Sequence, residues 1–287
     1  MKIIRRILAE EFSFLLACPA VIWQIFFLYL PLAVLIGYSF FEYPSFTLEY
    51  YNDVMSSVYL RVIARSFFVA LSTAFWCLLL AYPVAYFIAM KVPKQYKTMF
   101  LFLLILPSWT SLIVQIYAWF FLLDGNSFLC RFFSHIGLMG NSKHLLNNYF
   151  AILLVMIAVY LPFMILPLYT ALQKIDKRLL EASADLGANR VQTFLRIVFP
   201  LSLPGLYVGL LLVFLPAFGE FAIPTLLGGS KFLFWGNLIV DKFFIARNWR
   251  SGSAVAIVGI FFSCLFIVTL YGIIKLLSSN RKRRISR

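Results

Sequence analysis

Long apolar runs alternate with short charged segments along the 287-residue chain. Charged residues are missing from 12–41, 66–90, 98–123, 145–172 and 251–274, and Glu220 is the one charge between Arg196 and Lys231. A helix of about 20 residues crosses a hydrocarbon core of about 30 Å, so each run has the length of one span. The pattern predicts six transmembrane helices, over 14–40, 66–90, 99–123, 149–170, 201–225 and 253–277. Because the runs lack the alternation of barrel strands, we expect an all-α, polytopic membrane protein.

Composition excludes an ordinary soluble domain. Hydrophobic residues make up 63% and charged residues 13% of the chain, against about 45–50% and about 25% in soluble proteins. The formal net charge is +14. Loop charges that set membrane topology, together with anionic lipid headgroups, account for this charge. We therefore expect a lipid bilayer as a partner and no nucleic acid.

The distribution of Lys and Arg predicts the orientation of the spans. An even number of spans puts both termini on one side, together with the loops near 91–98 and 171–198. Of the 25 basic residues, 17 fall on that side: Lys2, Arg5, Arg6, Lys91, Lys94, Lys97, Lys174, Lys177, Arg178, Arg190, Arg196, Lys275, Arg281, Lys282, Arg283, Arg284 and Arg287. Both termini are therefore predicted to be cytoplasmic. This gives a cytoplasmic segment over 1–13, a transmembrane domain over 14–277 and a basic cytoplasmic tail over 278–287.

Three further features of the chain carry less information. The basic N-terminus followed by an apolar run is like a signal peptide, but the run continues to Phe41, which favours a first span. His135 and His144 fall in one outer loop, where solvated side chains are expected far more often than a metal pair. Cysteines show no C-x-x-C spacing, so neither a metal site nor a disulfide framework is predicted.

A compact charged segment, 171–200, separates the fourth and fifth spans. Its pattern predicts a short helix with Leu179, Ala182, Ser183 and Leu186 on one face. Asp176 can cap its start and Gly187 can end it in a left-handed turn. The small central residues leave a shallow surface against which another protein could pack, although periodicity alone also fits a connector lying on the membrane.

The residue identities in this segment resemble the EAA motif of ABC-importer permeases. Glu-Ala-Ser at 181–183, Gly187, and Ile197 followed by Pro200 stand at the motif's positions, with Ser183 in place of the usual second Ala. The resemblance implies the type I importer permease fold and a cytoplasmic coupling helix seated in a cleft of an ATPase subunit. The ATPase-coupling residues would be Leu179, Glu181, Ala182, Ser183, Asp185, Leu186 and Gly187.

Other stretches resemble the spermidine/putrescine branch of that family, and its putrescine-type permeases most. They are 106–111, 116–119, 161–163, 167–169, 218–221, 223–224, 226–229 and 247–249, with Gln115 standing where Arg is often found. The resemblance implies a subunit of the bacterial cytoplasmic membrane that translocates a small cationic substrate, a polyamine. Its partners would be a second permease, giving a heterodimer, two ATP-binding subunits, and a periplasmic or lipoprotein binding protein.

The chain itself has no evident means of using ATP. No G-x-x-x-x-G-K-[ST] loop occurs, so ATP would be bound by the partner subunit. We therefore expect a transport subunit that is not an enzyme and that holds no cofactor or metal of its own. The outer loops 124–148 and 226–252 would dock the binding protein, and 232–248 has the pattern of an interfacial helix.

Five side chains are candidates for the substrate path. An acidic residue inside a span is costly and suggests a function, and Trp or Tyr faces attract ammonium groups. Glu220 could instead pair with a basic residue of the partner permease or reach water at the outer interface, and each aromatic could simply pack or anchor in lipid. The candidates are Glu220, Trp109, Tyr117, Tyr160 and Asp124.

Alternative functions remain open from the residues alone. The same permease could carry ferric iron, sulfate, molybdate or another small solute, although a lone acidic residue in the membrane argues against anions. A self-contained secondary carrier would not need the EAA-like helix. An intramembrane enzyme would need a nucleophile beside a base on facing spans, and both histidines fall in a loop.

Overall fold

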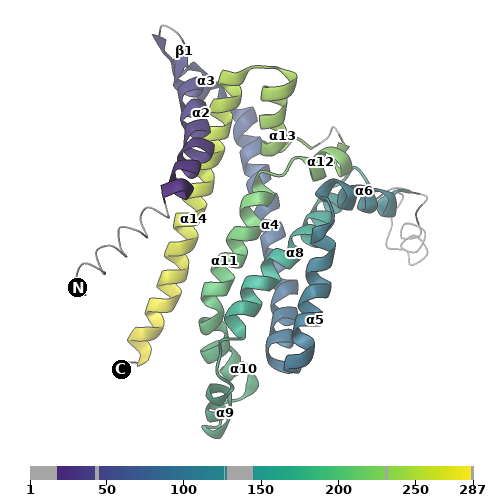
Figure 1. Cartoon of the computed structure of the whole chain (residues 1–287), viewed down its shortest axis with the longest axis vertical. Coiled ribbons are helices and arrows are strands. Elements are labelled where there is room, and N and C mark those ends of the chain that lie inside the picture. The colour runs from purple at the N-terminus through teal and green to yellow at the C-terminus, as the bar shows by residue number, and fades with distance from the viewer. Residues whose placement is uncertain (1–17, 43–44, 126, 128–144, 230–231, 286–287) are drawn as a thin grey trace. The chain divides into compact units, whose positions relative to one another are not determined.

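The computed structural model describes residues 18–42, 45–125, 127, 145–229 and 232–285. Among these residues, five helices are long and apolar enough to cross a membrane: Cys18–Phe40, Ser57–Lys91, Tyr149–Leu172, Arg190–Phe218 and Trp249–Leu276 (Figure 1). A bent pair of helices makes a sixth crossing if it counts as one span. The predicted all-α membrane class is confirmed. The segment 1–13 and most of the loop 124–148 lie outside the described residues.

The third predicted span, 99–123, is not one continuous helix. It consists of α5 (Lys94–Ile105), the 3-10 turn η3 (Leu106–Trp109) and α6 (Leu112–Leu123). The two arms meet at 89°. The break follows Pro107, whose ring cannot continue a helix, and coincides with a short run of polar side chains. Hydropathy averaged over the whole window concealed this break.

Two other helices differ from the predicted spans at their ends. The second helix begins before the predicted start at residue 66, since α4 (Ser57–Tyr86) includes Arg61 and Arg65. It ends with η2 (Phe87–Lys91). The fifth is built from α10 (Arg190–Thr193), η4 (Phe194–Val198) and α11 (Phe199–Phe218), with α12 (Ala222–Leu227) separate. Gly219 and Glu220 interrupt it before the predicted end.

The chain divides into two compact units, of which the first contains the described residues up to Tyr59 together with Ile239–Ile260. Its helix Cys18–Phe40 includes η1 (Ile25–Tyr29) and α2 (Leu30–Phe40), and is followed by the antiparallel pair β1 (Phe41–Glu42) and β2 (Ser45–Phe46) and by α3 (Glu49–Val54). Tyr51 donates a hydrogen bond to Ser39 Oγ (2.9 Å) and stacks on Phe40, which ties α3 to α2. The predicted interfacial helix is helical over α13 (Trp235–Val240) and η6 (Asp241–Ile245), before α14 (Trp249–Ile285).

The second unit, from Leu60 to Leu238 and from Phe261 onward, is built around α8 (Tyr149–Leu172) and α11. These two helices run side by side along most of their length (Figure 1). Half of the apolar window of α8 is buried, whereas none of the window in Cys18–Phe40 is. Phe214 of α11 stacks on Phe266 of α14 at 3.6 Å and adds a third helix to this core.

Glycine permits the close approach of α8 and α11. A Cβ atom on Gly205 would lie 2.5 Å from both the Ala171 Cβ and the Pro167 carbonyl oxygen. One on Gly209 would lie 2.7 Å from the Met164 sulfur. Small residues at such crossings let helix backbones pack tightly in a bilayer, where dispersion contacts hold helices together.

We predict that Gly205→Ala destabilises the protein by about 1–3 kcal/mol, because the added methyl group overpacks the crossing. The measurement is the thermal unfolding midpoint of the purified protein in detergent. Gly272→Ala in α14 is the matched control, since no atom lies within 4 Å of its added Cβ. An equal midpoint for both variants would contradict the tight crossing.

Candidate functional site

The predicted coupling helix is α9 (Lys177–Asp185), and its two ends are capped as expected. At the start, the Asp176 side chain accepts a hydrogen bond from the Arg178 N–H (3.0 Å). At the end, Gly187 adopts φ +79°. The Gly187 N–H donates to the Ala184 carbonyl and the Ala188 N–H donates to the Ser183 carbonyl, as in a Schellman turn. The helix is therefore defined by local sequence.

A second cap fastens α9 to the helix that follows. Asn189 accepts a hydrogen bond from the Gln192 N–H (2.8 Å), and the Gln192 side chain accepts one from the Asn189 N–H (3.0 Å), a reciprocal capping box at the start of α10. The hydroxyls of Ser183 and Thr193 lie 2.8 Å apart and link α9 to α10. Through η4, this connection leads directly into α11.

The seven predicted coupling residues differ in solvent exposure: six are exposed and Ser183 is buried. Leu186 is 88% exposed and Leu179 48%. Glu181, Ala182, Asp185 and Gly187 are exposed as well. Ser183 is only 8% exposed. Its side chain faces Thr193 within the chain, so the shallow surface available to a partner is formed by the other residues of the set.

A groove of about 420 Å³ runs beside this exposed surface. Leu179, Ala182, Leu186 and Gly187 form one of its sides, and Gln192, Arg196 and Ile197 of α10 and η4 are also among its lining residues. Its walls are largely apolar side chains on an otherwise polar segment. Such a groove is suited to receiving a side chain of another protein.

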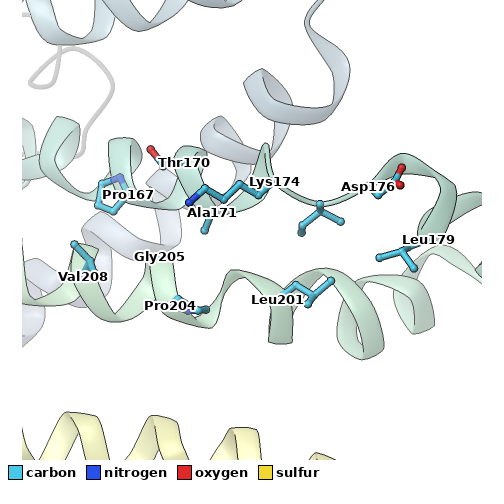
Figure 2. Close-up of a pocket in the computed structure, with 11 residues that line it drawn as sticks. Pro167, Thr170, Ala171, Lys174, Asp176, Leu179, Leu201, Pro204, Gly205 and Val208 are labelled. Carbon is cyan, nitrogen blue, oxygen red and sulfur yellow. The ribbon is translucent and has the colours of Figure 1, made fainter. Parts of the chain in front are cut away.

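A second groove, of about 600 Å³, lies between the end of α8 and the start of α11 (Figure 2). Pro167, Ala171, Pro204, Gly205 and Val208 give it apolar walls. Lys174 and Asp176 are its charged residues and lie toward α9. The groove continues past the end of α8 at Leu172 as far as Leu179 of α9.

Glu220 lies where α11 is interrupted, and it is 6% exposed. Its Oε1 accepts hydrogen bonds from the backbone N–H groups of Phe221 (3.0 Å), Ala222 (2.9 Å) and Ile223 (3.4 Å). Its Oε2 accepts one from the Tyr160 hydroxyl of α8 (2.5 Å). The carboxylate thus caps α12 and fastens it to α8. Its partners lie within the chain rather than in water.

Neighbouring residues also stabilise the segment between α11 and α12. The Asn237 side-chain amide donates to the Phe221 carbonyl (3.1 Å) and to the Thr225 hydroxyl (2.7 Å). Gly236 packs so closely on the Gly219 and Glu220 carbonyls that any Cβ there would clash with backbone. The segment around Glu220 is therefore fixed from both sides.

The other predicted path residues are placed on the bent third segment. Trp109, in η3, is 72% exposed and meets the Phe102 ring edge-on at 5.5 Å. Tyr117 of α6 is 46% exposed. Asp124 follows the end of α6, where its carbonyl accepts a hydrogen bond from Ser127. The structure therefore pairs Glu220 with Tyr160, and it places Trp109, Tyr117 and Asp124 on a separate element.

Gln115 was not predicted as a site residue, yet it spans the break in the third segment. Its Nε2 donates to the Pro107 carbonyl (2.6 Å), the Thr110 hydroxyl (3.0 Å) and the Thr110 carbonyl (3.3 Å). The polar run after Pro107 could have indicated this break. His135 and His144, which were considered as a metal pair, lie outside the described residues.

Comparison with known proteins gives consistent matches over most of the chain. Residues 81–283 match the family described as "Binding-protein-dependent transport system inner membrane component". The spermidine/putrescine transport system permease protein PotB of Haemophilus influenzae is 38% identical over 91% of this chain and 92% of its own length. PotB of Escherichia coli is 38% identical over 82% of this chain and 88% of its own.

A more distant relative and a solved structure extend this comparison. The inner membrane ABC transporter permease protein YdcU of Escherichia coli is 31% identical over 78% of this chain and 75% of its own. A crystal structure of a bacterial ABC transporter involved in the import of the acidic polysaccharide alginate has a chain that aligns with a TM-score of 0.75. The alignment covers 97% of this chain and 100% of that chain at 18% identity, which supports the fold.

Proposed function

The chain belongs to the inner membrane components of binding-protein-dependent transport systems, and we propose that it serves an ABC importer that carries polyamines. It is the permease subunit, and putrescine or spermidine is its substrate. The observation that carries this proposal is the 38% identity to PotB over 91% of the chain. The rival cargoes are ferric iron, sulfate and molybdate, and the transport assay below distinguishes them from polyamines.

The proposed role of α9 is to couple transport to ATP hydrolysis in a separate subunit. Its exposed apolar residues, Leu179 and Leu186, border the groove of about 420 Å³. Apolar anchors entering such a groove or cleft commonly dominate the affinity of protein interfaces. A complete importer would contain a second permease, two ATP-binding subunits and an extracytoplasmic binding protein, with this chain's termini in the cytoplasm.

The proposed substrate path uses Trp109, Tyr117, Tyr160, Asp124 and Glu220. An ammonium group is attracted to exposed aromatic faces by roughly 0.5–2 kcal/mol, and Trp109 offers the most exposed one of the set. Glu220 adds the acidic charge inside the membrane-spanning region. We propose that its first task is to cap α12 and that its charge then favours cations over anions.

Transport assays on the purified complex test this function. The chain is purified from its native membrane with its bound partners and reconstituted with its binding protein in liposomes. We expect ATP-dependent accumulation of radiolabelled putrescine or spermidine, and no accumulation of sulfate, molybdate or ferric iron. Co-purification of a P-loop ATPase is expected too. Uptake of an anion in place of polyamines, or the lack of an ATPase partner, would refute the proposal.

A further inference from the structure

The bend in the third apolar segment interrupts the helical hydrogen-bond ladder of a membrane-protein segment. Between η3 and α6, the regular hydrogen-bond ladder stops at Trp109 and resumes at Leu112. Non-helical backbone at membrane depth persists only where other groups satisfy it. The side chains that supply these contacts therefore determine whether the bend exists.

The Pro107 carbonyl is the centre of the contacts at the bend. It accepts hydrogen bonds from the Thr110 N–H (3.2 Å), the Thr110 hydroxyl (2.7 Å) and Gln115 Nε2 (2.6 Å). Ser108 donates separately to the Ile105 carbonyl (2.6 Å). The Thr110 and Ser108 contacts are local to the turn. Gln115 alone among these donors reaches back from α6, so it connects the two arms of the bend.

The chemistry of the partners fixes the orientation of the Gln115 amide. The Pro107 and Thr110 carbonyl oxygens accept hydrogen bonds and cannot donate them. The nitrogen of the amide must therefore face the bend and the oxygen must face away. A side chain at 115 needs donors to hold the two arms, and an acceptor of the same shape does not suffice.

We infer that Gln115 is the positioning residue of the bent third segment, and that transport requires a hydrogen-bond donor at this position. The inference concerning transport rests on the proposed function. The bend presents Trp109, which is 72% exposed, at the turn between the arms. Loss of the donor removes the contacts that α6 makes with the Pro107 and Thr110 carbonyls, and the arms then sample other angles. Fewer molecules hold Trp109 in its place on the proposed substrate path.

Four substitutions test the requirement for a donor. Gln115→Glu keeps the shape and replaces the donor by an acceptor. Gln115→Leu removes both the donor and the acceptor. Gln115→Lys and Gln115→Arg keep donors while changing the size and charge of the side chain. Val114→Leu, at a neighbouring exposed position of α6, is the control. For each variant we measure polyamine uptake by the reconstituted complex and the unfolding midpoint of that complex.

We expect Gln115→Glu and Gln115→Leu to lower the maximal uptake rate about tenfold, which corresponds to the free energy of one lost hydrogen bond. Both should also lower the unfolding midpoint. Gln115→Lys and Gln115→Arg should keep at least half of the uptake rate of the unsubstituted complex, which a role of Gln115 in packing alone would not explain. Normal uptake by Gln115→Glu, or equal losses in all four variants, would overturn the inference. If the unsubstituted complex carries another solute, the proposed function fails, and the unfolding midpoints still decide the role of Gln115.

Discussion

Glu220→Ala is expected to prevent the protein from accumulating in a folded form. The substitution leaves the N–H groups of Phe221, Ala222 and Ile223 and the Tyr160 hydroxyl without their acceptor. Each buried polar group left unpaired costs about 1–3 kcal/mol, and the sum is a large part of the roughly 5–15 kcal/mol that stabilises a typical protein. The measurement is the yield of monodisperse protein extracted from membranes, which should fall below a tenth of normal.

Two milder variants separate the structural role of Glu220 from its charge. Tyr160→Phe removes one of the four hydrogen bonds, so it should accumulate at nearly normal levels. Glu220→Gln keeps a carbonyl oxygen for the backbone N–H groups and should also accumulate. Because it removes the negative charge, we expect its KM for polyamine uptake to rise about tenfold, as for loss of one charge-assisted hydrogen bond. Unchanged kinetics in Glu220→Gln would restrict Glu220 to capping α12.

Leu186→Asp is expected to abolish ATP-driven uptake while the protein inserts and folds normally. Leu186 is 88% exposed, so the substitution removes no contact from the core of the chain. In the proposed complex the same side chain is buried against the ATPase, where truncating a central apolar anchor costs 2 kcal/mol or more. Replacing it by a carboxylate adds the penalty of burying a charge. Uptake should fall by about 30-fold or more.

Matched variants in α9 and at its C-terminal end show whether the loss of uptake in Leu186→Asp comes from failed binding of the ATPase. Leu186→Met keeps an apolar side chain of similar volume and should transport normally. Glu181→Arg, on the same exposed helix, should uncouple ATP hydrolysis from uptake. Co-purification of the ATPase is measured alongside uptake, and its loss should accompany loss of transport in Leu186→Asp. Full uptake by Leu186→Asp would remove α9 from the coupling role.

Local sequence was sufficient to predict α9 and its ends. Asp176 and Gly187 act through hydrogen bonds to residues within a few positions, and such contacts follow from residue type and spacing. The burial of Ser183 could not be predicted in the same way. It depends on Thr193, which lies beyond the turn at Gly187 and belongs to another helix.

The interruptions in the spans were harder to predict. Average hydropathy is nearly the same for a straight and a bent apolar segment, so hydropathy over 99–123 did not reveal the 89° angle, and only the polar run after Pro107 was a local sign of a break. For Glu220, the sequence revealed the unusual charge, but the expected partners were a passing polyamine, a basic residue of the partner permease or water. The hydroxyl partner is Tyr160, 60 residues away on α8, and only the packing of α8 against α11 brings the two together.

The tight crossing at Gly205 and the link between Ser183 and Thr193 have a mechanical consequence. At Gly205 and Gly209, α8 and α11 are in close contact, and α9 is joined to the base of α11 through α10. In the proposed coupling role, a displacement of α9 would therefore pass to α11 and, through the crossing, to α8.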